Sequence, residues 1–137
     1  MSGSSLALAN RPESVRPAVA FMLQKAKALQ LAAASKPLLE VALSEAVSNA
    51  VKHGGSSHHG VIVCEVERSP RHVIFRISDA GEGFVIPEAA LPYIDPDQVQ
   101  ALPESGYGVP IIQSVFPAVR GLHHNGRFTL ELCLPLD

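Results

Sequence analysis

One stretch of the sequence, residues 37–54, constrains the fold more than any other. It has the sequence PLLEVALSEAVSNAVKHG, and its apolar residues recur at the spacing of one buried face of a helix. These apolar residues are Leu39, Leu43, Ala46, Val47 and Ala50. Because such a face must be covered by another layer, we expect this helix to pack on a sheet.

Glu45 and Asn49 lie beside this apolar face. They are four residues apart, so their side chains should stand one above the other on the helix. One interpretation is an ordinary solvated helix edge. The other is a proton acceptor placed one turn from an oxygen ligand for a hard metal ion. The pair by itself leaves both interpretations open.

Length and charge limit the classes of protein to which the chain can belong. With 137 residues and 47% hydrophobic content, residues 1–137 suit a single domain with one core. A formal net charge of -2 provides no basic surface for nucleic acid. The apolar runs are short, and no targeting or lipidation motif is visible. We therefore expect a cytoplasmic protein without nucleic-acid or membrane partners.

The cysteines and histidines do not form a pattern typical of metal sites. Cys64 and Cys133 lie in expected strands without a CxxC pair, which favours buried, reduced thiols. The pairs His58–His59 and His123–His124 are adjacent in sequence, and neighbouring residues of a strand point to opposite faces. We therefore expect no structural zinc site.

The remaining pattern predicts an α+β domain. We expect a strand at 6–9, helices at 13–31 and 37–53, strands at 61–66 and 73–77, a helix at 109–116, and strands at 119–123 and 127–134. The dipeptide Asn125–Gly126 favours a tight hairpin turn between the last two strands. This order predicts a two-layer sandwich with the helices on one face of a mixed, mostly antiparallel sheet.

Two glycine-containing segments flank a long loop. The sequence DAGEG at 79–83 follows an expected strand, and SGYGV at 105–109 opens an expected helix. Between them, residues 84–105 show no sustained periodicity. A loop of this length inside a small domain is usually a lid or a binding loop. Each glycine segment alone is weak evidence, because glycine pairs occur in many turns.

Together these motifs resemble a known family. EAVSN on a helix, DAGEG after a strand and SGYGV before a helix, with a lid between the last two, are similar to the Bergerat-type ATP-binding fold. This is the fold of the GHKL family of gyrases, heat-shock chaperones, histidine kinases and MutL proteins. LSEAVSNAVKHG at 43–54 resembles the signature of its anti-sigma-factor serine kinases in bacterial partner-switching systems, and the resemblance extends over residues 12–135.

The resemblance implies a role for each matched residue around the nucleotide. Asp79 matches the aspartate that accepts a hydrogen bond from the adenine amino group, and Thr129 matches a threonine that supports adenine. Near Thr129 the usual GTT sequence is replaced by Gly126, Arg127 and Phe128. The glycines of the two boxes let the backbone approach the nucleotide and its phosphates closely. The matched box residues are Gly81, Gly83, Gly106, Tyr107 and Gly108.

The resemblance also assigns the helix residues. Asn49 matches the ligand of Mg²⁺, and Glu45 matches the general base that accepts the proton of the attacking hydroxyl. Lys52 and His53, at the end of the same helix, can contact phosphate or form an ordinary solvated helix end. The implied cofactors are ATP and Mg²⁺.

One departure from the family concerns phosphoryl transfer. Many kinases of this branch carry an arginine just before the second glycine box, where this chain has Pro103, Glu104 and Ser105. The candidates to replace this arginine are Arg127, Arg120 and a residue of a partner protein.

Three functions therefore stay open. The first is a kinase that phosphorylates a serine on a small antagonist protein and sequesters a sigma factor or another effector. The second is a module that binds ATP without phosphoryl transfer. The third is a detached histidine-kinase catalytic domain, which is disfavoured because the N-terminal helix contains no phosphoacceptor histidine. Related kinases also imply a homodimer through the first strand and helix.

Overall fold

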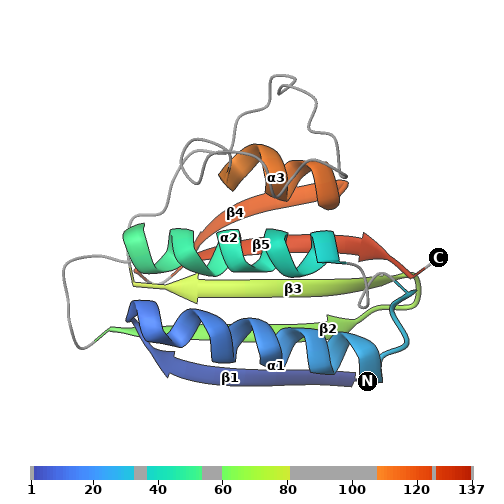
Figure 1. Ribbon diagram of the computed structural model, residues 1–137, viewed down its shortest axis with the longest axis horizontal. Coiled ribbons are helices and arrows are strands. Elements are labelled where there is room, and N and C mark those ends of the chain that lie inside the picture. The colour runs from blue at the N-terminus through green and yellow to red at the C-terminus, as the bar shows by residue number, and fades with distance from the viewer. Residues whose placement is uncertain (1, 33–36, 54–59, 81–107, 125, 137) are drawn as a thin grey trace.

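The computed structural model describes residues 2–32, 37–53, 60–80, 108–124 and 126–136. The strands are β1 (Ser2–Ala9), β2 (Val61–Arg68), β3 (His72–Asp79), β4 (Ala118–His124) and β5 (Arg127–Pro135). The helices are α1 (Val15–Ala28), α2 (Pro37–His53) and α3 (Gly108–Val115), and a short 3-10 helix, η1 (Pro12–Ser14), precedes α1 (Figure 1). None of the helices in these ranges is long and apolar enough to cross a lipid bilayer.

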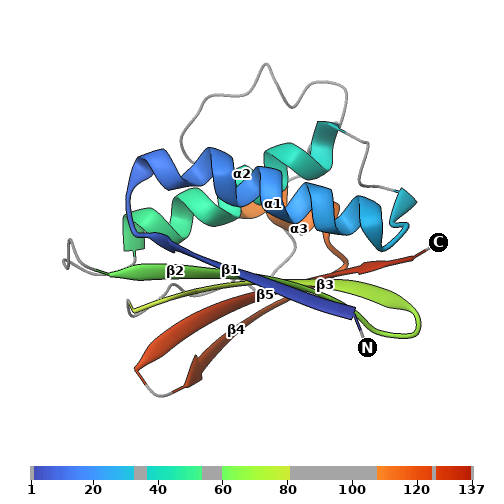
Figure 2. The ribbon, with the colours of Figure 1, turned by 90° about the horizontal axis from the view of Figure 1, so that it is seen from below.

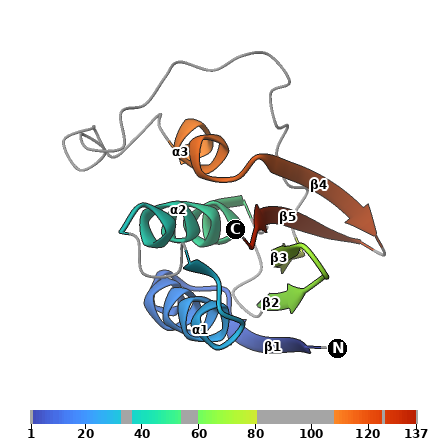
Figure 3. The same ribbon diagram turned by 90° about the vertical axis from the view of Figure 1, so that its right-hand side faces the viewer.

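The five strands form one sheet in the order β1-β2-β3-β5-β4. Figures 2 and 3 show all three helices on one face of this sheet, so the expected α+β two-layer sandwich is confirmed. All four strand pairs are antiparallel. The parallel pair that a mixed sheet would contain is therefore not found among the described strands. The other face of the sheet, opposite the helices, is called the open face below.

The core lies between the helices and the sheet. Every residue of the predicted apolar face of α2 is buried, as are alternate residues of the central strands β3 and β5. On β3 these are Val73, Phe75 and Ile77, and on β5 they are Phe128, Leu130, Leu132 and Leu134. The alternation assigns each strand residue to the helix-facing side or to the open face.

A network of charged side chains crosses the open face. Arg76 donates hydrogen bonds from Nε to Glu131 (2.9 Å) and from Nη2 to Glu67 (3.2 Å). Arg120 donates from Nε to the other oxygen of Glu131 at 3.1 Å. Glu131 is only 6% exposed, because the two arginines cover it from the neighbouring strands β3 and β4. The network thus joins β2, β3, β5 and β4.

The pKa of Glu131 reflects two opposing effects. Burial raises the pKa of this carboxyl, but the hydrogen bonds from Arg120 and Arg76, together with their charges, outweigh burial and lower it below its ordinary value. The carboxylate therefore stabilises the folded state when it is ionised.

Two boundaries differ by three or more residues from the sequence-based expectation. β1 begins at Ser2 rather than at residue 6, because the small residues Ser2–Ser5 continue the antiparallel ladder with β2. α1 ends at Ala28 rather than at residue 31. There Gln30 takes a left-handed conformation with φ 65°, and the amides of Gln30 and Leu31 bond back to Lys27 and Ala26. These two bonds are those of a Schellman motif, which usually has glycine at the left-handed position.

The two cysteines lie on opposite sides of the sheet. Cys64 is buried on the helix-facing side of β2, and Cys133 lies on the open face of β5, so the two thiols cannot be bridged. Burial raises the pKa of the Cys64 thiol to about 11. Both cysteines are free, as the sequence predicts.

Substitution of Glu131 by glutamine tests the network. The Glu131→Gln variant should lose about 1–3 kcal/mol of unfolding free energy at pH 7, because two arginines lose their carboxylate partner. The stabilisation is present above the unfolded-state pKa and is lost as the pH falls through the lowered pKa of Glu131, so the difference from wild type should shrink in acid. Urea unfolding at several pH values measures this difference.

Glu65→Gln is the matched control. Glu65 also lies on the open face, in register with Arg76, but forms no ion pair within the described ranges. Its substitution should change stability by less than about 0.5 kcal/mol. Equal losses in the two variants, or a difference that does not change with pH, would contradict the assignment of the stabilisation to Glu131.

The end of α1 provides a second prediction. A left-handed conformation costs a residue with a Cβ about 1–2 kcal/mol, so Gln30→Gly should stabilise the protein by about 1 kcal/mol. Glycine at the exposed helical position Gln24 should instead destabilise it by about 1 kcal/mol. Thermal unfolding of the two variants compares the effects, and a lower melting temperature for Gln30→Gly would contradict the motif.

Candidate functional site

Helix α2 places Glu45 and Asn49 one turn apart. Both side chains are partly buried at the edge of the buried face of the helix, as the spacing predicts. The helix packs against α1, α3 and β3, so its position relative to the sheet is fixed by contacts on several sides. The carboxylate and the carboxamide therefore lie at a defined place on the helical layer.

Asp79 is the last residue of β3 and is only 2% exposed. It follows the alternation of Phe75 and Ile77, so it belongs to the helix-facing side of the sheet. A carboxylate that is withdrawn from water in this way needs polar partners, and such groups are common in ligand sites. In Figure 1 the C-terminal ends of α2 and β3 lie at the same end of the sandwich, on the left. The end of the helix that carries Glu45 and Asn49 and the end of the strand that carries Asp79 thus lie at the same end of the sandwich.

Gly108 begins helix α3, which packs on α2. The start of α3 lies within the second glycine segment, one residue before the predicted start, and the first amides of a helix are available as donors to an anion. The other residues of the two glycine boxes, Gly81, Gly83, Gly106 and Tyr107, lie outside the described residues. His53 is the last residue of α2, and its neighbour Lys52 is exposed.

Thr129 is not brought to the side of the sheet that carries Asp79. It pairs with Ser78, and the alternation along β5 places it on the open face. The residue that pairs with Asp79 is Phe128, which is 2% exposed.

The neighbour of Phe128 on β4 is His123, whose ring centroid lies 5.1 Å from that of Phe128. Asp79, Phe128 and His123 therefore form one row across three strands. The sequence does not assign Phe128 to the site, because the hairpin after β4 pairs Phe128 only with His123 and the register between β3 and β5 has no local signal.

Arg127 and Arg120 are both engaged on the open face. Arg127 donates from Nη2 to the carbonyl oxygens of Val61 (2.9 Å) and Ser78 (3.1 Å), and Arg120 bonds to Glu131. The expectation that either arginine replaces the missing arginine of the kinases is wrong in this arrangement, because Glu45 and Asn49 lie on the opposite side of the sheet. Arg127 instead ties the start of β2 to the end of β3, next to Asp79.

These groups suit a magnesium nucleotide in their chemistry. A buried carboxylate can accept a hydrogen bond from the amino group of a base, and the side-chain oxygen of Asn49 is the type of ligand that Mg²⁺ prefers. A carboxylate such as Glu45 can accept a proton. In the part of the chain that the structure describes, no three His, Cys, Asp or Glu side chains gather as a metal-binding group.

Comparison with known proteins identifies the family. Residues 8–133 match the histidine kinase-like ATPase domain family, and the chain belongs to this family. The fold is similar to a crystal structure of the RsbU and RsbW domains of Rv1364c from Mycobacterium tuberculosis, with a TM-score of 0.65 and 18% sequence identity. The match covers 97% of this chain and 32% of that chain, so this chain spans about a third of its length. A comparison of the sequence with curated proteins gave no match.

Proposed function

We propose that this protein is a Mg²⁺-ATP-dependent serine-protein kinase of a partner-switching system. Its substrate is a serine on a small antagonist protein, and it also sequesters a sigma factor or another effector. The observation that carries the proposal is the position of Asp79, a buried carboxylate on the side of the sheet covered by the helix with Glu45 and Asn49. Membership of the histidine kinase-like ATPase family supports ATP as the nucleotide.

Asp79 gives the site its preference for adenine. Its carboxylate accepts a hydrogen bond from the exocyclic amino group, whereas a base with a carbonyl at that position would place a second acceptor against the carboxylate. A hydrogen bond to a buried charge contributes roughly 1.5–3 kcal/mol, enough to favour ATP over GTP. Phe128, beside Asp79, adds an apolar surface to the same place. Gly81, Gly83, Gly106 and Gly108 allow close approach to the nucleotide, and Tyr107 and His53 belong to the same nucleotide-binding set.

Glu45 acts as the general base. It accepts the proton of the serine hydroxyl of the antagonist as that oxygen attacks the γ-phosphorus, and ADP leaves with the electrons of the broken P–O bond. Asn49 holds Mg²⁺ through one oxygen ligand. When bound, this ion neutralises the negative charge of the phosphates.

The partners of the proposed kinase are proteins. The similar structure carries domains named RsbU and RsbW, which supports a protein-regulating role. β1 is an edge strand, paired only with β2 among the described strands, which supports a homodimer formed through β1 and α1. We place the protein in the cytoplasm, with no nucleic-acid or membrane partner.

A second function is favoured by one observation. Because Arg120 and Arg127 are both engaged on the open face, neither of them replaces the arginine missing before the second glycine box. A module that binds ATP and holds its partner without phosphoryl transfer is therefore the alternative.

Two substitutions test the kinase and separate it from this alternative. Glu45→Gln should slow the transfer of label from radioactive ATP to the antagonist by about 10²–10⁴-fold and leave ATP affinity nearly unchanged. Asp79→Asn should weaken ATP binding by about tenfold or more, because it replaces the acceptor carboxylate. Calorimetry measures the affinities. Glu40→Gln, an exposed change on the same helix, is the control and should alter neither quantity.

The labelled product distinguishes the functions. Label on serine supports the kinase, whereas ATP binding without label supports the regulatory module. Label on a histidine would indicate the histidine-kinase reaction. An unchanged rate in Glu45→Gln would remove Glu45 from the mechanism.

A further inference from the structure

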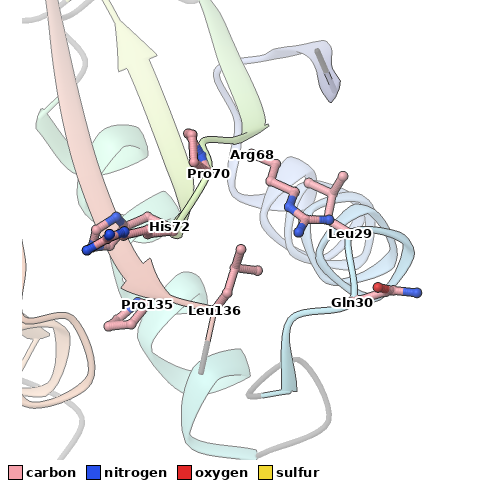
Figure 4. A pocket seen from close by; sticks show the side chains of 8 residues that line it. Leu29, Gln30, Arg68, Pro70, His72, Pro135 and Leu136 are labelled. Atoms are coloured by element: carbon pink, nitrogen blue, oxygen red, sulfur yellow. The ribbon is translucent and has the colours of Figure 1, made fainter.

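A cavity of about 660 Å³ lies at the end of the sandwich opposite the candidate site. Three segments line it: the end of α1, the turn between β2 and β3, and the end of the chain after β5 (Figure 4). In Figure 1 these segments meet on the right, whereas the ends of β3, whose last residue is Asp79, and of α2 lie on the left. The cavity is therefore separate from the residues assigned to nucleotide binding.

Backbone hydrogen bonds fix the walls of this cavity. The end of α1 is closed by the bond from the Leu31 amide to Ala26. In the turn, Ser69 donates its amide to the carbonyl of His72 at 2.9 Å, and the amide of His72 bonds to the hydroxyl of Ser69. The amide of Leu136 bonds to the carbonyl of Arg71 at 2.9 Å and so ties the end of the chain to the turn. A ligand would meet preformed walls, which reduces the entropy cost of binding.

The cavity is basic in a chain whose net charge is -2. Arg68, Arg71 and His72 line it, and no acidic side chain is among the described residues that form its walls. Neither Arg68 nor Arg71 forms an ion pair with any described residue, whereas Arg76 and Arg120 on the open face both pair with Glu131. Two exposed guanidinium groups at one cavity, without an ion-pair partner in the described ranges, are available to bind carboxylates from outside the chain.

The arrangement of the lining favours an extended ligand. Figure 4 shows Arg68 on the side of α1 and His72 on the side of β5, with Leu136 between them. Leu136, between the basic groups, and Leu29, beside Arg68, are both partly buried and supply apolar surface. A ligand with negative charges on both sides of an apolar group matches this pattern better than one small anion.

We propose that this cavity binds an acidic peptide segment of a partner protein, in which carboxylates flank an apolar side chain. The carboxylates pair with Arg68 and Arg71, and the apolar side chain covers Leu29 and Leu136. Because the cavity and the candidate site lie at opposite ends, a partner can be held here while the nucleotide end stays open. The inference does not depend on ATP binding or on phosphoryl transfer.

The test uses a fluorescein-labelled peptide of alternating glutamate and leucine, and the same peptide with glutamine in place of glutamate. Fluorescence anisotropy at low salt should show binding of the acidic peptide alone. In the double variant Arg68→Gln/Arg71→Gln the affinity should fall at least tenfold. The control, Arg11→Gln/Arg16→Gln, removes the same charge at two exposed arginines outside the cavity and should change the affinity less than twofold.

Amide NMR shifts provide the second measurement. The acidic peptide should shift the amides of Leu29, Arg71 and Leu136. Equal binding in the two double variants would indicate unspecific attraction and overturn the proposal, as would no binding to the wild-type chain. Inorganic phosphate that shifts the same amides as strongly as the peptide would also overturn it, in favour of a small-anion site.

Discussion

The burial of one face of α2 against the sheet is the contact on which the rest of the structure depends. Leu39, Leu43 and Val47 are almost fully removed from water, and burial of each such side chain is worth roughly 1.5–3 kcal/mol. Once this face is fixed, the helical period leaves Glu45 and Asn49 no position except the edge of the contact. The direction of the helix places its C-terminal end, beyond Asn49, at the end of the sandwich at which β3 finishes with Asp79. The apolar spacing that buries α2 therefore also sets the positions of Glu45 and Asn49.

The two faces of the sheet carry different kinds of interaction. The helix-facing side is apolar except near the end of β3, where the candidate site begins. The open face is joined by the network around Glu131 and by the bonds of Arg127 to the β2 and β3 backbone. Because these arginines are used to connect strands, their side chains do not reach the helix-facing side. Residues 33–36, 54–59 and 81–107 contain no arginine, so they offer no replacement either.

The sequence predicts whatever depends on a strong local pattern. The apolar period of α2, the hairpin at residues 125 and 126 and the order of elements follow directly from it. The sequence does not predict that β1 begins at Ser2, because serine and glycine have little strand preference. The antiparallel ladder with β2 forms that part of the strand. Nor does the sequence predict the end of α1, where a glutamine takes a left-handed conformation that usually needs glycine.

For the candidate site, Thr129 shows what a sequence motif cannot predict. A motif match to the last strand leaves an uncertainty of one residue, and a shift of one residue moves a side chain to the other face of a sheet. The backbone register places Phe128 beside Asp79 and Thr129 on the open face.

The most direct test of the account is a crystal structure with Mg²⁺ and a non-hydrolysable ATP analogue. We predict density with the base against Asp79 and the phosphates between Asn49 and Gly108, and a nucleotide bound elsewhere, or none, would contradict the account.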